Sequence, residues 1–150
     1  MNQILIQEQV FDTGQVIQGL YQDNPQVGAV ASFVGVCRDM NEGEQVQQMR
    51  LEHYPGMTEK SIEAIVEEAR EKWQILDCVV IHRIGILEPS DPIVLVAVSS
   101  QHRHQALDAC AYIMDFLKSR APFWKHEATL QGGRWVSSRD SDKTALERWK

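Results

Sequence analysis

The fold follows first from the stretch LDCVVIHRIGILEPSDPIVLVAVSS at residues 76–100. It holds two apolar runs, 76–85 and 92–100, joined by the turn-like sequence EPSDP. Short continuous runs rich in Val and Ile are typical of buried strands. We therefore expect two strands here, the second of them buried and leading directly into a helix.

Two amphipathic helices are expected beside this pair of strands. One begins at Thr58, the expected N-cap. The other spans about 103–120 and ends near Ala121, because the residue before Pro122 is disfavoured in the α region. Apolar residues recur at helical spacing in both. The first stripe is Ile62, Ile65, Val66, Ala69 and Trp73, and the second is Ala106, Ala109, Cys110, Ile113 and Leu117.

Three further strands are expected outside this region. Residues 3–6 form a short apolar run, and 46–54 alternate between apolar and polar side chains, as in a half-buried strand. The continuous apolar run VGAVASFVG at 27–35 fits a largely buried strand. We also expect a helix at 13–21 capped by Thr13, a loop at 37–45, a hairpin at 127–136 around Gly132-Gly133, and a helical tail from Asp140.

The order β-α-β-β-α-β-β-α-β-β predicts an α+β fold with a mixed or antiparallel sheet packed with two main helices. The 150 residues are 43% apolar and 24% charged, which fits a single globular domain, 1–150. No apolar run approaches the roughly 20 residues of a membrane span, and the start of the chain lacks a signal-peptide pattern.

The cysteines at positions 37, 78 and 110 form no CxxC pair. An odd number without that spacing argues against a disulfide framework or a zinc ribbon, and a reducing cytoplasm is the simplest compartment. The five histidines show no metal-ligand spacing either, so no metal site is expected.

Charge is distributed unevenly along the chain. Residues 1–50 carry 2 basic and 6 acidic side chains (−4), residues 51–100 carry 4 and 9 (−5), and residues 101–150 carry 9 and 6 (+3), giving −6 in total. An acidic total argues against nucleic acid as a partner. The basic final third instead suggests a local site for a small anion.

The segment KSRAPFWKHE at 118–127 is the most unusual in the chain. Lys118 and Lys125 bracket a turn-like APFW whose aromatic rings need shelter. Shelter of this kind lowers the local dielectric and favours an uncharged amine, which can act as a nucleophile or base. The alternative is a simple aromatic plug under the helix end, with both amines in water.

Two weaker features point to anion binding. In SSQHRH at 99–104, His102 and Arg103 stand at a helix start, where free backbone N–H groups attract anions, although ordinary capping explains the same pattern. Cys37-Arg38, just after an expected strand, offers another donor. The cysteine is either an activated thiol beside an arginine or an inert buried residue.

Helix geometry separates two of these features. Arg103 and Lys118 stand at opposite ends of one helix, roughly 22 Å apart at 1.5 Å per residue. No small substrate spans that distance. If both belong to one site, a second copy of the chain must supply one of them, which predicts a homodimer with shared active sites.

The sequence resembles the family of molybdopterin synthase large, catalytic subunits across nearly its whole length. The resemblance is carried by LEHYPGMTEK (51–60), VIHRIG (80–85), the HR of SSQHRH, and IMDFLKSRAPFWKHE (113–127). It implies an α+β fold of the α/β-hammerhead type and a cytoplasmic sulfurtransferase without a cofactor. Its implied partners are a second copy of the chain and, in a heterotetramer, a small ubiquitin-like subunit with a C-terminal Gly-Gly thiocarboxylate.

The reaction implied by the resemblance inserts two sulfurs into cyclic pyranopterin monophosphate (precursor Z), forming the dithiolene of molybdopterin in molybdenum cofactor biosynthesis. Lys118 and Lys125 match the two essential lysines of the family. Lys118 is expected at the thiocarboxylate carbon or the opening of the substrate, and Lys125 in proton transfer and phosphate stabilisation. The substrate-binding residues implied are Val36, Cys37, Arg38, His102, Arg103, Lys118, Lys125, His126 and Glu127, with Arg139 a further anion contact.

Three positions depart from the pattern of the family. Cys37 replaces a small apolar residue, and Asp39 and His126 stand where Asn and Arg are expected. Two other functions stay open on the residues alone. One is a non-catalytic module that binds a ubiquitin-like tail or a phosphorylated pterin. The other, an acyl-transferase using Cys37, lacks a matching His/Asn signature.

Overall fold

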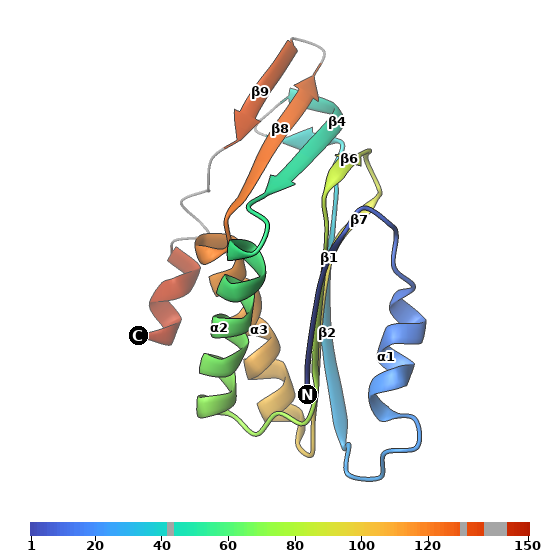
Figure 1. The fold of residues 1–150 in the computed structure, drawn as a ribbon, viewed down its shortest axis with the longest axis vertical. Helices are drawn as coiled ribbons and strands as arrows, with labels where there is room; N and C mark the ends of the chain where they lie inside the picture. Colours follow the sequence, from blue (N-terminus) through green and yellow to red (C-terminus); the bar gives the residue numbers. More distant parts are fainter. Residues whose placement is uncertain (42–43, 130–131, 137–143) are drawn as a thin grey trace.

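The structure is a computed structural model in which residues 1–41, 44–129, 132–136 and 144–150 are described. Figure 1 shows a sheet seen edge-on, with two long helices on one face and one short helix on the other. A second, smaller sheet stands at one end of this sandwich. This arrangement is an α+β fold, as predicted.

The larger sheet has four strands in the order β1-β5-β7-β2. They are β1 (Asn2–Gln7), β5 (Cys78–Arg83), β7 (Pro92–Ser100) and β2 (Ala29–Val36). β1 and β5 are parallel, whereas β7 is antiparallel to both of its neighbours. The two runs quoted from 76–100 therefore form the two central strands, and their side chains are almost entirely buried.

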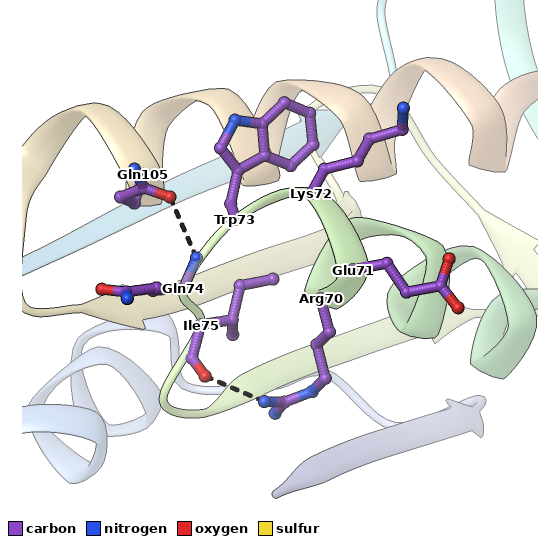
Figure 2. Close-up of a pocket in the computed structure, with 7 residues that line it drawn as sticks. All are labelled: Arg70, Glu71, Lys72, Trp73, Gln74, Ile75 and Gln105. Carbon is purple, nitrogen blue, oxygen red and sulfur yellow. Dashed lines mark hydrogen bonds between the residues drawn. The ribbon is translucent and has the colours of Figure 1, made fainter.

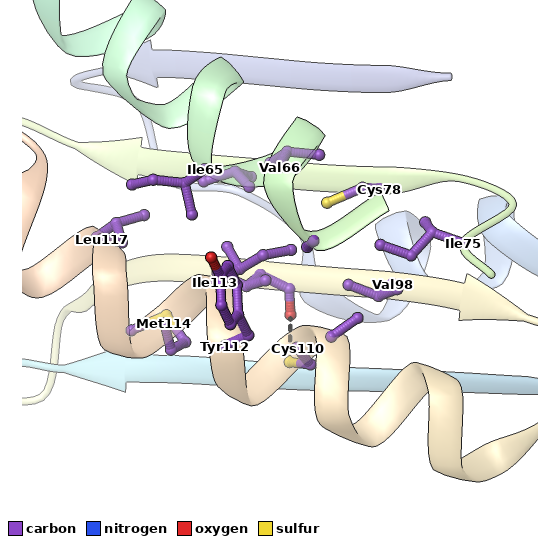
Figure 3. Packing of buried hydrophobic residues seen from close by; sticks show 14 of the residues in the cluster. Ile65, Val66, Ile75, Cys78, Val98, Cys110, Tyr112, Ile113, Met114 and Leu117 are labelled. Atoms are coloured by element: carbon purple, nitrogen blue, oxygen red, sulfur yellow. Dashed lines mark hydrogen bonds between the residues drawn. The ribbon is translucent and has the colours of Figure 1, made fainter. Parts of the chain in front are cut away.

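Helices α2 (Met57–Lys72) and α3 (Arg103–Arg120) cover one face of this sheet and α1 (Thr13–Tyr21) covers the other. Figure 3 shows the main core, in which Ile65 and Val66 of α2 meet Ile113 and Leu117 of α3 above the sheet. The predicted stripes of both helices are confirmed, since their members are buried except for Trp73, which is partly buried.

The smaller sheet combines β4 (Glu44–His53), β8 (Phe123–Thr129) and β9 (Gly132–Val136), with short strands β3 (Met40–Asn41) and β6 (Gly85–Leu87) paired to β4. A 3₁₀ helix, η1 (Leu146–Trp149), ends the chain. The smaller sheet buries one face: Met49 and Leu51 of β4 and Leu87 of β6 are at most 4% exposed and pack with Cys37. Of the alternation predicted for 46–54, the part at Met49 to Glu52 is confirmed, because Arg50 and Glu52 are exposed.

Two helix starts differ from the prediction. Asp12, not Thr13, caps α1, because its carboxylate accepts the Gln15 N–H at 3.1 Å. Gly56 is the N-cap of α2 at a positive φ of 85°, and the Glu59 carboxylate accepts the Gly56 N–H at 3.1 Å. Thr58 is therefore not the N-cap of α2, and its hydroxyl makes other hydrogen bonds, described below.

The other differences concern strand limits. β8 begins at Phe123, so the predicted APFW turn is largely the start of a strand, and the Gly132-Gly133 pair lies inside β9. The expected loop at 37–45 contains β3 and the start of β4. The expectation that 27–35 is largely buried is wrong for its second half, because β2 is an edge strand.

Candidate active site

The connection from α3 to β8 brings the two predicted lysines to the same end of the molecule. Lys118 lies in the last turn of α3 and Lys125 is the third residue of β8. Thr58 holds this connection against the start of α2: its hydroxyl donates to the Pro122 carbonyl at 3.2 Å and its oxygen accepts the Tyr54 N–H at 3.1 Å. Thr58 is fully buried, so both bonds are shielded from water.

His82 of β5 lies where the two lysines converge. Its ring is 6% exposed and stacks on Phe123 with the centroids 3.8 Å apart. Nδ1 lies 2.8 Å from the Arg83 carbonyl oxygen, which accepts only, so Nδ1 carries the proton and Nε2 is left as an acceptor. Burial lowers the pKa of His82 from 6.5 to about 4, and the charges of Lys125, His53 and Lys118 act in the same direction. The site thus contains a neutral imidazole near the two lysines, Lys118 and Lys125.

Cys37 directly follows β2 and packs with Met49 and Leu51 of β4. It is 4% exposed, and its backbone is fixed by the turn before β7: its N–H donates to the Asp91 carbonyl at 2.9 Å and its carbonyl accepts the Ser90 N–H at 2.7 Å. Burial raises the pKa of the Cys37 thiol, and Glu127 and Asp91 raise it further, against Lys125. A thiol held protonated is a poor nucleophile, which argues against the activated-thiol alternative.

The side chains of β8 point alternately to the two faces of the smaller sheet. Lys125 and Glu127 stand opposite Leu51 and Met49 of β4, on the face that packs against Cys37, and Glu127 is 5% exposed. His126 points to the other face, where its ring lies over Gly133: a Cβ there would come within 2.5 Å of the His126 ring. The structure therefore brings Lys118, Lys125, Glu127 and Cys37 together and turns His126 away from them.

His102 and Arg103 lie at the far end of α3 from Lys118 (Figure 1). Both side chains are exposed, and the His102 side chain makes no capping hydrogen bond. Within one chain the predicted site is thus divided. Val36 and Arg38 are exposed at the Cys37 end, and Arg139 lies outside the described residues.

The predicted aromatic shelter is not found. Lys118 and Lys125 are both exposed, Trp124 is 46% exposed, and Phe123 packs on His82. Trp124 stands on the opposite side of β8 from Lys125, because neighbouring residues of a strand alternate between its faces. The lysines are therefore placed near His82 by the connection from α3 to β8, and both side chains are exposed rather than covered by the aromatic rings.

A hollow of about 550 Å³ lies elsewhere, at the C-terminal end of α2 (Figure 2). The polar groups of its lining residues are used in hydrogen bonds to one another. The Arg70 guanidinium donates to the Ile75 carbonyl at 2.9 Å, and the Gln105 side chain accepts the Gln74 N–H at 2.9 Å. It contains none of the predicted site residues. We therefore treat it as a surface depression between structural residues.

Two other kinds of feature, a metal site and a membrane-spanning helix, are not found among the described residues. In the described part of the chain, no group of three or more His, Cys, Asp or Glu side chains is arranged to hold a metal ion. None of the helices among the described residues is both long and apolar enough to cross a membrane.

Three residues of the site were missed from the sequence. His82 has a local signal, because a histidine inside the apolar run CVVIHR indicates a buried imidazole. The sequence predicts only a turn at Asp91 and only a helix cap at Thr58. The signal for these two is absent, because each depends on a contact between segments that are distant in the chain.

Comparison with known proteins places the chain in a family. The family model described as MoaE protein matches residues 6–120. The chain belongs to the MoaE family. The molybdopterin synthase catalytic subunit of Ralstonia nicotianae is 56% identical over 149 residues, covering 99% of this chain and 85% of the relative. That of Escherichia coli K12 is 49% identical over 146 residues, covering 97% of both.

Solved structures agree with this MoaE assignment. A molybdopterin biosynthesis MoaE protein from Burkholderia ambifaria has 47% identity and a TM-score of 0.85, covering 99% of this chain and 98% of that one. A molybdopterin synthase from Staphylococcus aureus has 35% identity and a TM-score of 0.82, covering 91% and 98%. A two-subunit molybdopterin-converting factor complex from Helicobacter pylori, 18% identical with a TM-score of 0.72, shares the fold and covers 92% and 91%.

Proposed function

We propose that this chain is the catalytic subunit of a molybdopterin synthase. In this reaction it transfers two sulfurs from the C-terminal thiocarboxylate of a small ubiquitin-like subunit to cyclic pyranopterin monophosphate. Each thiocarboxylate carries one sulfur, so two copies of the small subunit are used in turn. Water supplies the oxygen that converts each spent tail to a carboxylate, and the two transferred sulfurs form the dithiolene. Membership of the MoaE family supports the enzyme class. The observation that carries the proposal is that the connection from α3 to β8 places Lys118 and Lys125 at the same end of the fold, near the buried His82.

The two lysines suit complementary steps. Lys118 stands at the exposed end of α3, where it can meet the thiocarboxylate carbon or the opening ring of the substrate. Lys125 lies on the face of β8 that carries the buried Glu127, which provides a carboxylate partner for proton transfer close to the reacting atoms. Two ammonium groups also stabilise the negative charge of the phosphate as its ring is opened.

The small subunit and a second copy of this chain are the proposed partners. A small subunit must deliver its flexible Gly-Gly tail to the lysines. His102 and Arg103 supply hydrogen-bond donors for the phosphate from the other end of α3, roughly 22 Å from Lys118 along the helix. A homodimer resolves this separation if each site takes Lys118 from one copy and Arg103 from the other. With one small subunit on each copy the assembly is a heterotetramer, acting in the cytoplasm.

The direct test mixes the purified chain with thiocarboxylated small subunit and cyclic pyranopterin monophosphate and measures the dithiolene product. We expect product from the unmodified chain and none above background from Lys118→Ala or Lys125→Ala. Lys72→Ala is the matched control, because Lys72 is an exposed lysine at the far end of α2. Product formation equal in Lys118→Ala and the unmodified chain would contradict the proposed roles. Binding of the small subunit without any product would favour the non-catalytic module instead.

A further inference from the structure

We propose that Thr58 is a positioning residue of the active site: its buried hydroxyl fixes the link between α3 and β8, and this link sets the place of Lys125 relative to Lys118. The link consists of Ala121 and Pro122, the two residues between the end of α3 and the start of β8. The contact of Thr58 with the link is a feature of the fold. Its effect on turnover rests on the proposed function.

The link is short and lies between two regular elements. Lys118 belongs to the last turn of α3, and Lys125 belongs to the part of β8 that is paired with β4. The backbone of each element is fixed by its own hydrogen bonds, and the ring of Pro122 fixes one further dihedral angle. A rotation within the link would therefore move one lysine relative to the other.

Pro122 interrupts the pairing of β4 with β8. His53 is paired with Phe123, so the next two positions along this ladder are Tyr54 and Pro122. Proline has no N–H group and cannot donate to the Tyr54 carbonyl. The direct pairing of the two strands therefore ends one residue before the link.

Thr58 supplies the hydrogen bonds that Pro122 cannot make. Its N–H donates to the Tyr54 carbonyl at 2.9 Å, and its Oγ1 accepts the Tyr54 N–H at 3.1 Å. The same hydroxyl donates to the Pro122 carbonyl at 3.2 Å. One hydroxyl can donate and accept at the same time, so Thr58 bridges the strands where the ladder stops. The start of α2, the end of α3 and the start of β8 meet at this point (Figure 1).

Burial makes this bridge important. Thr58 is 0% exposed, so water cannot take the place of its hydroxyl in the folded chain. A buried N–H or C=O group that loses its partner is costly, whereas an exposed one is hydrated. If the hydroxyl is removed, the Tyr54 N–H and the Pro122 carbonyl both need new partners, and the link must move to provide them.

His82 holds the link from the other side. Cys78 and Val80 of β5 pack in the core below α2 and α3, so His82, which is next in the alternation, points to the same face. Its ring stacks on Phe123 with the centroids 3.8 Å apart and the planes 17° apart. The start of β8 thus lies between Thr58 of α2 and His82 of β5.

This position of Thr58 predicts a particular kinetic effect. Thr58 acts on the backbone of the link and leaves both lysines and their charges in place. Displacement of a catalytic group by about 1 Å can lower the rate by about 100-fold. The loss should therefore appear in kcat, with little change in KM, because the groups that bind the substrate are retained.

The first test measures dithiolene formation by Thr58→Val, which keeps the shape of the side chain and removes the hydroxyl. We expect kcat to fall by about 10- to 100-fold and KM for cyclic pyranopterin monophosphate to stay within about 2-fold. Thr58→Ser retains the hydroxyl and should keep kcat within about 3-fold of the unmodified chain. If Thr58→Val does not fold, as judged by far-UV circular dichroism, Thr58→Ala removes the same hydroxyl with less bulk.

Ile65→Val is the matched control for a loss of packing. Ile65 is also 0% exposed and lies in α2, but it contacts the core rather than the link. Ile65→Val should keep the full kcat. Full kcat in Thr58→Val overturns the proposal. A loss in Thr58→Ser as large as that in Thr58→Val also overturns it, because the hydroxyl would then not be the group that matters.

The second test follows the link without using activity. Phe123 is one of four phenylalanines, so labelling with 4-fluorophenylalanine gives four ¹⁹F resonances, and Phe123→Leu assigns the one from Phe123. Because this ring is stacked on His82, its resonance is sensitive to their relative position. It should shift in Thr58→Val and stay in place in Thr58→Ser and Ile65→Val. An unchanged resonance in Thr58→Val contradicts the role of the hydroxyl in holding the link.

The two readouts separate this inference from the proposed function. If the resonance shifts in Thr58→Val but even the unmodified chain makes no dithiolene, Thr58 holds the link and the proposed function fails. If the unmodified chain is active and Thr58→Val has the same kcat, the proposed function stands and the positioning role of Thr58 is wrong.

Discussion

His82 determines how the site responds to acid. Its ring is buried against Phe123 and its pKa is lowered to about 4, mainly by burial, whereas an unfolded histidine has a pKa of about 6.5. Between these values the unfolded chain binds one proton more than the folded chain, so the free energy of unfolding falls as the pH falls through this window. His82 alone should cost about 2 kcal/mol of stability between pH 7 and pH 5.

Urea unfolding at both pH values measures this effect. Carboxylates titrate in the same range, so the comparison is with His82→Gln, which should lose that part of the pH dependence. His104→Gln is the control, because His104 is exposed at the start of α3. An identical pH dependence in the unmodified chain and His82→Gln would show that His82 does not resist protonation.

Cys37 has a structural role in this account. Its backbone holds the turn at Ser90 and Asp91, its side chain packs with Met49 and Leu51, and burial raises the pKa of its thiol. Cys37→Ser should therefore retain dithiolene formation with thiocarboxylated small subunit, with a loss of stability of about 1 kcal/mol for the buried hydroxyl. Loss of product in a variant that remains folded would instead indicate a sulfur relay through Cys37.

The 3₁₀ helix η1 packs the end of the chain against Trp73, which follows α2, and against α3. Trp149 packs edge-on against Trp73 and Tyr112, with ring centroids 5.5 and 5.4 Å apart, and its indole N–H donates to Asp115 at 2.6 Å. Trp149→Ala should lower the free energy of unfolding by about 2 kcal/mol, below the value for a fully buried Trp because this one is only partly buried.

Chemical denaturation followed by far-UV circular dichroism tests this contribution. Lys150→Ala is the neighbouring control: its amine pairs with Glu147 at 3.0 Å on the surface, which is worth little. If Trp149→Ala and Lys150→Ala unfold at the same urea concentration, the packing of η1 does not stabilise the helix pair.

The elements differ in how far the sequence predicts them. α3 was predicted from Arg103 to Arg120, as observed, because its periodicity and Pro122 are local signals. β3 and β6, of two and three residues, are too short to carry a pattern. The exposure of Phe33 and Val34 was missed because strand order is non-local: an edge strand and a central strand can have the same apolar sequence.

The residues of the site also differ in how far the sequence predicts their positions. Lys118 and Lys125 are seven residues apart across a short connection, so their proximity is implied by the sequence. His82, Asp91 and Thr58 each reach the site through a separate tertiary contact. No pattern in the neighbouring sequence predicts these contacts. The separation of Arg103 from Lys118 was predictable from the rise of a helix alone.

For the whole molecule, the central claim is that each active site combines Lys118 of one copy with the partner's Arg103. Neither Arg103→Ala nor Lys118→Ala should form dithiolene alone. In a dimer of one copy of each, one site contains both intact residues and the other contains neither.

Equimolar mixing with exchange of copies therefore measures this claim directly. Half of the dimers are mixed and each has one intact site, so activity should return to about a quarter of that of the unmodified chain. A mixture of Lys118→Ala and Lys125→Ala is the control and should stay inactive, because both lysines come from the same copy. Activity at about a quarter supports the shared site, and no recovery in samples shown to contain mixed dimers would contradict it.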